Sequence, residues 1–363
     1  MKSRIIAYYL PQFYPIPEND EWWGKGFTDW TSVKNARPLF PGHVQPKIPG
    51  ALGYYDLRDK DTRIKQASLA AQYGIEGFCY WHYWFGNGRQ ILNEVFDEVL
   101  QTGKPDFPFC LGWANHTWYK NKFSNSGTKE VLIRQTYPGT EDYKKHFELV
   151  VKAFTDSRYL TVQNKPIFVV YRPWEIPGVQ DFIQLWNKWS REYGFDGVYF
   201  IAYCFKLNEI EPLLQKGFSA VNIIRLYHFE DYLDNTQKAL NWFNKNIFHK
   251  GKVIEYKKAS LYFDGKEDEQ PEVIPTIIPN WDHSPRSGRR EHILINSDPT
   301  AFKVHVENVL NRVKSKDNPL VFVKSWNEWA EGNYLEPDQE YDMKKLETLS
   351  GVLKSYEGIE ASE

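Results

Sequence analysis

The segment LVFVKSWNEWAEGNYLEP, residues 320–337, joins a continuous apolar run to a cluster of acidic and aromatic residues. The apolar part has the composition of a β-strand that is buried on both faces, as the strands of a parallel sheet are. Three carboxylates, Glu328, Glu331 and Glu336, follow it directly. This order predicts a parallel strand that delivers reacting groups at its carboxyl end.

Seven further apolar runs of similar length precede this segment, and amphipathic segments separate them. The apolar positions between residues 140 and 154 recur every three or four residues, as in a helix that packs on a core. Asp298 followed by Pro299 predicts another helix start, because Asp caps the first backbone N–H groups and Pro is tolerated at the first helical position. The predicted strands are RIIAYYL (4–10), IEGFCYW (75–81), FPFCLGW (107–113), PIFVVYR (166–172), GVYFIAY (197–203), AVNIIRL (220–226), VIPTIIP (273–279) and LVFVKSW (320–326).

Eight strands that alternate with about eight helices predict an α/β fold, a single (β/α)8 TIM barrel over residues 1–363. A doubly wound open sheet is the alternative, but no strand is followed by the G-x-G-x-x-G turn of its nucleotide-binding forms. Long insertions follow strand 1 (11–58) and strand 3 (114–139), and another precedes strand 7 (246–272). Because the first two begin at strand carboxyl ends, we expect long loops at the face where barrel enzymes build their sites.

The charge balance is close to neutral, with 45 Lys and Arg against 47 Asp and Glu. It gives no electrostatic case for nucleic acid or an anionic membrane as a partner, and no apolar run approaches the ~18 residues of a membrane span.

The N-terminus enters a predicted strand without the apolar region of a signal peptide. The sequence as written predicts a cytoplasmic protein, or a periplasmic or secreted one if an export signal has been removed. No coiled coil or exposed apolar stripe predicts an oligomeric state.

Aromatic residues are unusually common, since 14 Trp, 23 Tyr and 23 Phe make up 17% of the chain. Many of the Trp residues stand beside Asn, His, Asp or Glu, where a core would require apolar neighbours. Aromatic rings in polar clefts suit the apolar faces of sugar rings, whose hydroxyls remain free for hydrogen bonds. The composition therefore favours an oligo- or polysaccharide as the ligand.

The pair Glu328 and Glu331 supplies the residue types that glycoside cleavage requires. One carboxyl group protonates the leaving oxygen, and the other acts as base, nucleophile or stabiliser of the positive charge that develops on the sugar. Two carboxylates crowded beside Trp326 and Trp329 would have their pKa values driven apart, which separates the two roles. The alternative is a solvated acidic loop after a core strand, which the flanking Trp residues disfavour.

The motif within this segment resembles the S-[FW]-N-E-W-x-E-G-x-x-[IL]-E-P signature of family 99 glycoside hydrolases, the endo-α-mannosidases and endo-mannanases. The stretches AYYLPQFYPIPENDEWWGKGFTDW, GIEGFCYWHYWF and LGWANHTW are similar to the WbsX-like relatives of that family, found in bacterial polysaccharide loci. Together these stretches span most of the chain. The resemblance implies a (β/α)8 barrel with Glu331 as general acid/base. It implies that Glu328 assists the sugar's own 2-hydroxyl in attacking the anomeric carbon, a retaining route for manno-configured sugars.

Further polar and aromatic residues fall at predicted strand ends, which a barrel would bring to one mouth. Each alone could be core or loop packing, but together they favour sugar recognition. Asn327 is expected to orient one glutamate, while the aromatic loop of residues 21–45 could form a wall of the site or pack elsewhere. The candidate substrate-binding residues are Tyr9, Gln12, Trp30, Tyr80, His82, Trp84, Trp113, Asn115, His116, Tyr171, Tyr203, Trp281, Asp282, Trp326, Asn327 and Glu336.

No cofactor or metal is predicted. His82, His116 and Asp282 could meet in space, but the sequence lacks the H-x-x-x-H and H-E-x-x-H spacings of common metal sites. The basic run of residues 286–290 is either a contact for an acidic sugar or phosphate or a solvated loop. The cysteines at positions 79, 110 and 204 are odd in number and lie within apolar segments, so we expect small buried side chains rather than a disulfide.

Three functions remain open on the sequence, and a glycoside hydrolase acting on a bacterial or host polysaccharide is the favoured one. A glycosyltransferase of O-antigen or capsular polysaccharide biosynthesis is the second. The sequence shows no convincing site for the diphosphate of a sugar nucleotide. Asp59-Lys60-Asp61 matches the D-x-D metal motif in letters only and suits a helix start. A non-catalytic carbohydrate-binding protein is the third, and it would not need a paired glutamate motif.

Overall fold

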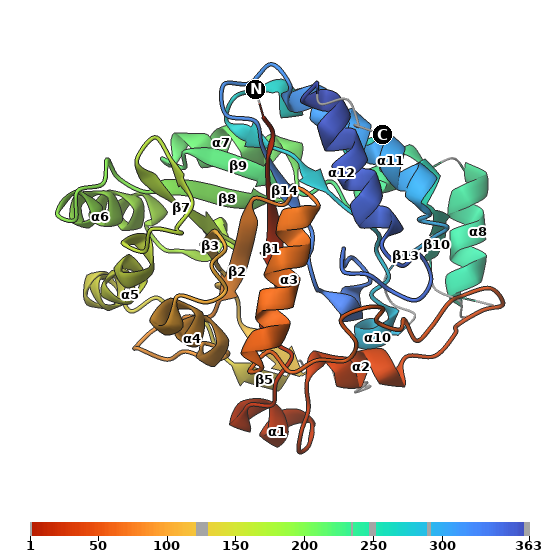
Figure 1. Ribbon diagram of the computed structural model, residues 1–363, viewed down its shortest axis with the longest axis horizontal. Helices are drawn as coiled ribbons and strands as arrows, with labels where there is room; N and C mark the ends of the chain where they lie inside the picture. Colours follow the sequence, from red (N-terminus) through yellow and green to blue (C-terminus); the bar gives the residue numbers. More distant parts are fainter. Residues whose placement is uncertain (1, 121–129, 234, 247–251, 289–291, 359–363) are drawn as a thin grey trace.

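The computed structural model describes residues 2–120, 130–233, 235–246, 252–288 and 292–358 (Figure 1). The strands form one curved, mainly parallel sheet, in which the last strand, β14, pairs with the first, β1. Its strands include β1 (Arg4–Tyr9), β2 (Gly77–His82), β3 (Phe109–Trp113), β7 (Lys165–Val170), β8 (Tyr199–Cys204), β9 (Ala220–Ile223) and β14 (Leu320–Val323). Each lies within or beside one of the predicted apolar runs.

The seventh position of the barrel is divided at Pro275. One half, β11 (Val273–Ile274), pairs with β9, and the other half, β12 (Thr276–Ile277), pairs with β14. Pro275 has no N–H to donate to a neighbouring strand, but its carbonyl accepts a bond from Phe322 N at 3.1 Å. The two short strands join the sheet between β9 and β14, so the predicted (β/α)8 barrel is confirmed.

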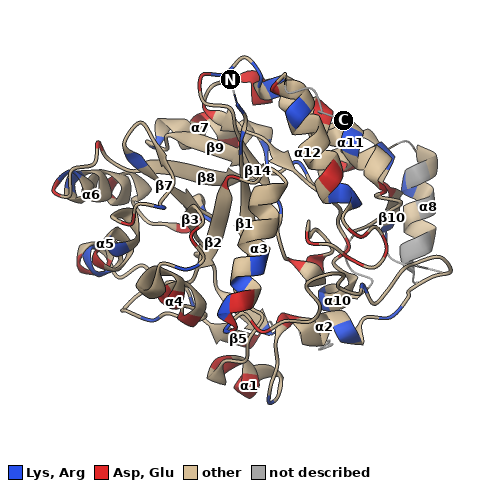
Figure 2. Ribbon diagram, viewed as in Figure 1, with Lys and Arg blue, Asp and Glu red and all other residues tan. Residues whose placement is uncertain are grey.

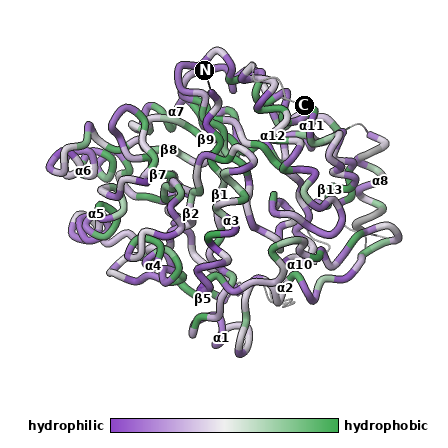
Figure 3. Tube along the Cα trace, in the orientation of Figure 1, coloured by the Kyte–Doolittle hydropathy of each residue, from purple (hydrophilic) through white to green (hydrophobic). Residues whose placement is uncertain are grey.

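Helices surround the sheet, and the charged residues lie on the helices and loops, whereas the strands are largely uncharged and apolar (Figures 2 and 3). Asp298 caps α11 by accepting from Thr300 N and Ala301 N at 2.9 and 3.0 Å, as predicted. In the described residues no helix is long and apolar enough to cross a membrane. The outer helices are α3 (Lys60–Gln72), α4 (Glu94–Thr102), α5 (Thr140–Phe154), α6 (Val179–Arg191), α7 (Ile210–Gln215), α11 (Pro299–Val313) and α12 (Lys344–Tyr356).

The insertions contain the remaining elements. Helices α1, α2 and α10 and strand β5 lie at the lower end of the barrel in Figure 1, the end toward which β1 runs. The antiparallel hairpin of β4 and β5 belongs to the insertion after β3, and β10 pairs in parallel with β13. The bounds are α1 (Pro17–Trp23), α2 (Asp29–Asn35), β4 (Trp118–Lys120), β5 (Glu130–Ile133), β6 (Thr161–Val162), α8 (Asn235–Asn246), β10 (Lys252–Glu255), α9 (Tyr256–Ala259), α10 (Ser284–Ser287) and β13 (His292–Ile295).

Side chains along each strand alternate between the barrel interior and the layer under the helices. On β2, the ring of Tyr80 packs outward against Phe96 of α4, with centroids 5.3 Å apart. The next ring, Trp81, points inward and stacks on Tyr8 at 4.7 Å. The three cysteines, at positions 79, 110 and 204, are buried and free, so the prediction of small buried side chains is confirmed.

Two valines of α11 provide a test of this packing. Val306→Ala should lower the free energy of unfolding by about 2 kcal/mol, because it removes two methyl groups from a fully buried position. Val304→Ala removes the same atoms where 46% of the residue is exposed, and should change that free energy by less than about 0.5 kcal/mol. Urea unfolding followed by circular dichroism measures both. Equal losses at the two positions would contradict the orientation of α11.

Candidate active site

A cavity of about 460 Å³ lies at the carboxyl ends of the strands. Both glutamates of the predicted pair line it, together with residues of the first insertion, the ends of β2, β3 and β7, the β4–β5 hairpin and α10. The lining residues are Leu10, Gln12, Trp23, Phe27, Asp29, Ser32, Trp81, Tyr83, Ala114, His116, Thr117, Trp118, Tyr119, Leu132, Tyr171, Arg286, Lys324, Glu328 and Glu331.

The ammonium of Lys324 joins the two glutamates. Its Nζ lies 3.1 Å from Oε2 of Glu328 and 3.2 Å from Oε2 of Glu331. Lys324 follows β14 directly, and only 10% of its side chain is exposed. A buried ammonium needs compensating negative charge, which the two carboxylates supply. Lys324 lies within the segment 320–337, but it was not among the site residues predicted from the sequence.

Glu328 is the more buried member of the pair, with 5% of its side chain exposed. Trp81 Nε1 donates to its Oε1 at 2.8 Å, and its backbone N–H donates to Ser325 Oγ at 2.8 Å. Burial, followed by the nearby charge of Glu331, raises the pKa of Glu328 to about 7, although Lys324 opposes the shift.

Glu331 has a different electrostatic environment. Arg286 Nη1 donates to its Oε1 at 2.7 Å, and His283 Nε2 lies 3.8 Å from the same oxygen. Burial opposes ionisation, but Lys324 and Arg286 hold the pKa of Glu331 well below its usual range. The two carboxyl groups therefore have widely separated affinities for a proton, and burial and the neighbouring cations separate them.

The first insertion packs directly on the motif. Asp29 of α2 accepts from Arg286 Nη2 at 2.9 Å, and the backbone N–H of Ala330 donates to Asp29 at 3.3 Å. Since Trp23 and Phe27 line the cavity, part of this insertion forms a wall of the site. The basic run thus contributes Arg286 as an ion-pair partner, while Arg289 and Arg290 lie outside the described residues.

Asp282 also ties the first insertion to the motif. His43 Nε2 and Gln45 Nε2 bond to its Oδ2 at 2.8 and 2.6 Å, and its backbone N–H donates to the carbonyl of Glu331 at 2.8 Å. Gly332 has φ +66°, and a Cβ there would lie 2.7 Å from Asp282 N. The glycine of the motif therefore permits a close approach that a side chain would prevent.

Several candidate substrate-binding residues lie where the sequence predicted, and others support the cavity from behind. Gln12, His116 and Tyr171 line it. Tyr203 packs beneath Tyr171 with ring centroids 5.0 Å apart. Trp281 lies 5.7 Å from the ammonium of Lys324, measured to its ring centroid.

A second group of candidates faces away from the cavity, which corrects the expectation that all strand-end residues meet at one mouth. Tyr9 Oη donates to Gln66, Trp84 stacks on His146 of α5 at 4.9 Å, and Trp326 packs on Phe78. The physical reason is strand alternation, because neighbouring residues of one strand project to opposite sides. The outward-facing candidates are Tyr9, Tyr80, His82, Trp84, Trp113 and Trp326.

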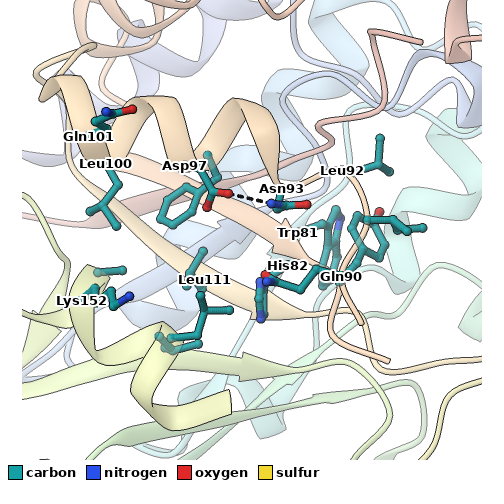
Figure 4. Close-up of a pocket in the computed structure, with 16 residues that line it drawn as sticks. Trp81, His82, Gln90, Leu92, Asn93, Asp97, Leu100, Gln101, Leu111 and Lys152 are labelled. Atoms are coloured by element: carbon teal, nitrogen blue, oxygen red, sulfur yellow. Dashed lines mark hydrogen bonds between the residues drawn. The ribbon is translucent and has the colours of Figure 1, made fainter. Parts of the chain in front are cut away.

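His82 illustrates the difference. Its Nε2 lies 2.9 Å from Nε2 of His146, and it lines a separate cavity of about 340 Å³ between α4 and α5 (Figure 4). Leu111 of β3 and Leu100 of α4 line the same outer cavity. His82 therefore does not join His116 and Asp282 in a shared site.

Four more candidates serve internal contacts. Asn327 bonds to the backbone of Leu10 in both directions, at 2.7 and 3.0 Å, which fixes the loop after β1 rather than orienting a glutamate. Glu336 accepts from three side chains, Tyr55 Oη, Gln66 Nε2 and Trp329 Nε1. Asn115 bonds to the backbone of Arg172, and Trp30 Nε1 donates to the carbonyl of Tyr55. These residues do not line the cavity.

The inward-facing residues Trp81 and Tyr83 were missed by sequence reasoning, which chose their neighbours. One available signal was Gly112, the register partner of Trp81 on β3. A Cβ at Gly112 would lie 3.0 Å from the Trp81 ring, so the glycine leaves room for an inward indole.

A barrel whose last strand ends in two buried, oppositely tuned glutamates has the architecture of enzymes that act on glycosidic bonds. The chain belongs to the family described as glycosyltransferase WbsX, whose profile matches residues 5–349. The protein named "Uncharacterized protein WxcX" in two strains of Xanthomonas campestris pv. campestris is 32% identical over 342 residues. That match covers 93% of this chain and 48% of WxcX, so the chain spans about half the length of these curated relatives.

Solved structures share the fold at low sequence identity. The GH99 endo-alpha-mannosidase from Bacteroides thetaiotaomicron is 14% identical with a TM-score of 0.54, over 98% of each chain. A glycoside hydrolase-like protein is 14% identical with a TM-score of 0.57, over 98% of this chain and 94% of the other. The predicted membership of the WbsX family is thereby confirmed, and the likeness to the GH99 enzyme and the glycoside hydrolase-like protein is a likeness of fold.

The two glutamates should affect stability in opposite directions at pH 8. The pKa of Glu328 is raised in the folded chain. Its stabilising contribution to the free energy of unfolding is therefore present at low pH and lost as pH rises from about 4.5 to about 7. Glu328→Gln removes this loss and should raise Tm by a few degrees. Glu331→Gln leaves Lys324 and Arg286 with less negative charge and should lower Tm. Calorimetry at pH 8 gives the order, and a lower Tm for Glu328→Gln would contradict the assignment.

Proposed function

We propose that the protein cleaves glycosidic bonds of an oligo- or polysaccharide with retention of configuration, using Glu331 as its general acid/base and Glu328 as the second carboxylate. The observation that carries this proposal is the shared ammonium of Lys324, which contacts both carboxyl groups. Lys324 keeps Glu331 ionised, while burial and the charge of Glu331 raise the pKa of Glu328 to about 7, so below that pH the pair carries one proton and one group can donate while the other accepts.

The proton has to lie on the residue that faces the leaving oxygen. The resemblance to family 99 assigns that role to Glu331, whereas the cations of the free site favour the proton on Glu328. A sugar hydroxyl that takes over the contact of Arg286 with Glu331 would raise the pKa of Glu331, because it replaces a positive charge. We therefore propose that substrate binding moves the shared proton to Glu331.

The reaction then has two balanced steps. Glu331 gives its proton to the glycosidic oxygen, and the bond from that oxygen to the anomeric carbon breaks. Glu328 accepts the proton of the sugar's 2-hydroxyl, whose oxygen forms a bond to the anomeric carbon. Water opens this anhydro-sugar with the proton transfers reversed, which restores the pair and gives net retention.

The rest of the cavity suits a sugar ligand. Tyr83, Trp118 and Tyr171 offer ring surfaces, and the ring of Trp118 lies edge-on to Tyr83 at 5.3 Å. Gln12 and His116 add polar atoms to the same lining. Aromatic faces bordered by hydrogen-bonding groups match the two chemically different surfaces of a pyranose.

The family description favours a second candidate, a glycosyltransferase. The same pair could transfer the sugar to a hydroxyl of an acceptor glycan in place of water. The acidic pair Asp59 and Asp61 offers little support for a metal-dependent transferase, since Asp59 accepts from Asp61 N as the cap of α3. Transfer from a sugar nucleotide without hydrolysis of any glycan would favour this second candidate.

The activity test uses Glu331→Gln and Glu328→Gln on α-mannosides and bacterial polysaccharides that carry manno-configured sugars. Each variant should lose about 10²–10⁴-fold in kcat, because each removes a group that transfers a proton. With an activated leaving group such as fluoride, Glu331→Gln should recover much of its first-step rate, since the departing group no longer needs a proton, and Glu328→Gln should not.

The control is Glu336→Gln, a buried glutamate of the same motif that lies outside the cavity lining. The folded Glu336→Gln variant should have the kcat of the wild type. Full wild-type rates in the Glu331 variant would refute the acid/base role, and glycan binding without turnover in every protein would favour a carbohydrate-binding function.

The dependence of kcat/KM on pH tests the shared proton. This ratio should fall as pH rises through about 7, because the free pair then loses the proton that it must donate. Lys324→Gln removes a cation that lowers both carboxyl pKa values, so the alkaline limb should move to higher pH. Circular dichroism checks that the variant folds. A limb that stays in place would exclude Lys324 as the electrostatic partner of the pair.

A further inference from the structure

Arg172 is held rigidly beside the cavity. It follows β7 closely, and Asn115 holds its backbone by accepting from its N–H at 2.7 Å and donating to its carbonyl at 2.9 Å. Its guanidinium lies 4.6 Å from the ring centroid of Tyr171 and 5.6 Å from that of Phe205. Cation–π contact with two rings restrains the guanidinium, while its remaining N–H groups can still donate hydrogen bonds to a ligand.

This guanidinium lies next to residues that line the cavity. Nη2 of Arg172 is 3.4 Å from Oη of Tyr171, and Tyr171 lines the cavity together with His116. The positive charge of Arg172 acts on His116, where burial first and this charge second lower the pKa to about 4. Arg172 therefore borders two residues of the cavity lining, Tyr171 and His116, on the β7 side.

The charges inside the cavity balance without Arg172. Lys324 and Arg286 are positive, Asp29 and Glu331 are negative, and Glu328 holds a proton below about pH 7. Arg286 is thus already paired with two carboxylates. By contrast, among the described residues no carboxylate lies within 4.0 Å of the Arg172 side-chain nitrogens. Within the part of the chain that the structure describes, the cation that borders this balanced site therefore has no acidic partner.

We propose that Arg172 binds an acidic substituent, a carboxylate or a phosphate, on the sugar that occupies the cavity. A guanidinium can donate two parallel hydrogen bonds to either group, which gives orientation as well as charge attraction. The protein would then select acidic glycans over neutral ones. This inference rests on the proposed function for the identity of the ligand as a manno-configured sugar, but its test needs no turnover.

The experiment compares three probes that differ only at C6: methyl α-mannoside, its 6-carboxylate (the methyl mannosiduronate) and its 6-phosphate. Binding to the wild-type chain is measured by calorimetry or saturation-transfer NMR. At least one acidic probe should bind about tenfold or more tightly than the neutral one, and raising the salt concentration should reduce the difference. Which acidic probe binds better distinguishes carboxylate from phosphate.

Matched variants then locate the preference. Arg172→Gln should bind the three probes about equally, and Arg172→Lys should keep part of the acidic preference. Lys206→Gln is the control, because it removes a positive charge after the next strand, from a side chain that is 72% exposed. It should behave as wild type.

Equal binding of acidic and neutral probes by the wild type, or no saturation by either acidic probe, would overturn the proposal. So would an acidic preference that survives Arg172→Gln. A preference that depends on Arg172 in a protein that cleaves no glycan would instead reject the proposed hydrolysis and retain this inference, so the two failures are distinguishable.

Discussion

The ammonium of Lys324, within 3.2 Å of both Glu328 and Glu331, is the interaction on which the arrangement of the site depends. Two carboxyl groups this close in a cavity mostly removed from water would repel one another if both were ionised. Lys324 counters that repulsion by contacting both carboxyl groups, and Arg286 adds a second cation that contacts Glu331 only. The asymmetry gives the two glutamates different proton affinities, although they belong to one short motif.

Much of the fold could be predicted, because strands buried on both faces are continuous apolar runs, and helices that cover them have apolar residues at every third or fourth position. The run 320–326 and its seven counterparts all contribute barrel strands. The division of residues 273–279 at Pro275 has a reason visible in the sequence, since proline cannot donate to either neighbouring strand.

The direction in which each strand side chain points, into the barrel or toward the helices, could not be predicted. The continuous apolar runs that identify the strands also conceal this alternation. When both sides of a strand are apolar, the two-residue alternation leaves no mark in the sequence, so Tyr80 and Trp81 look equivalent. They differ only in what lies opposite, which is Phe96 of α4 for one and Tyr8 inside the barrel for the other. A lysine within an apolar run is the exception, because Lys324, directly after β14, needs a polar or charged partner where it is buried.

Contacts between distant insertions were beyond prediction, and they decide which charges are available to a ligand. The pairing of Asp29 with Arg286 joins residues 257 positions apart, with no local signal in either segment. The sequence left the basic run of residues 286–290 open between a contact for an anion and a solvated loop, and the structure pairs Arg286 with two carboxylates of the protein. Arg172 stands alone in the sequence and attracts no notice there. Its contacts with the rings of Tyr171 and Phe205, and its lack of an acidic partner among the described residues, make it the stronger candidate. The charge of a ligand therefore follows from which protein charges remain unpaired, rather than from the composition of the sequence.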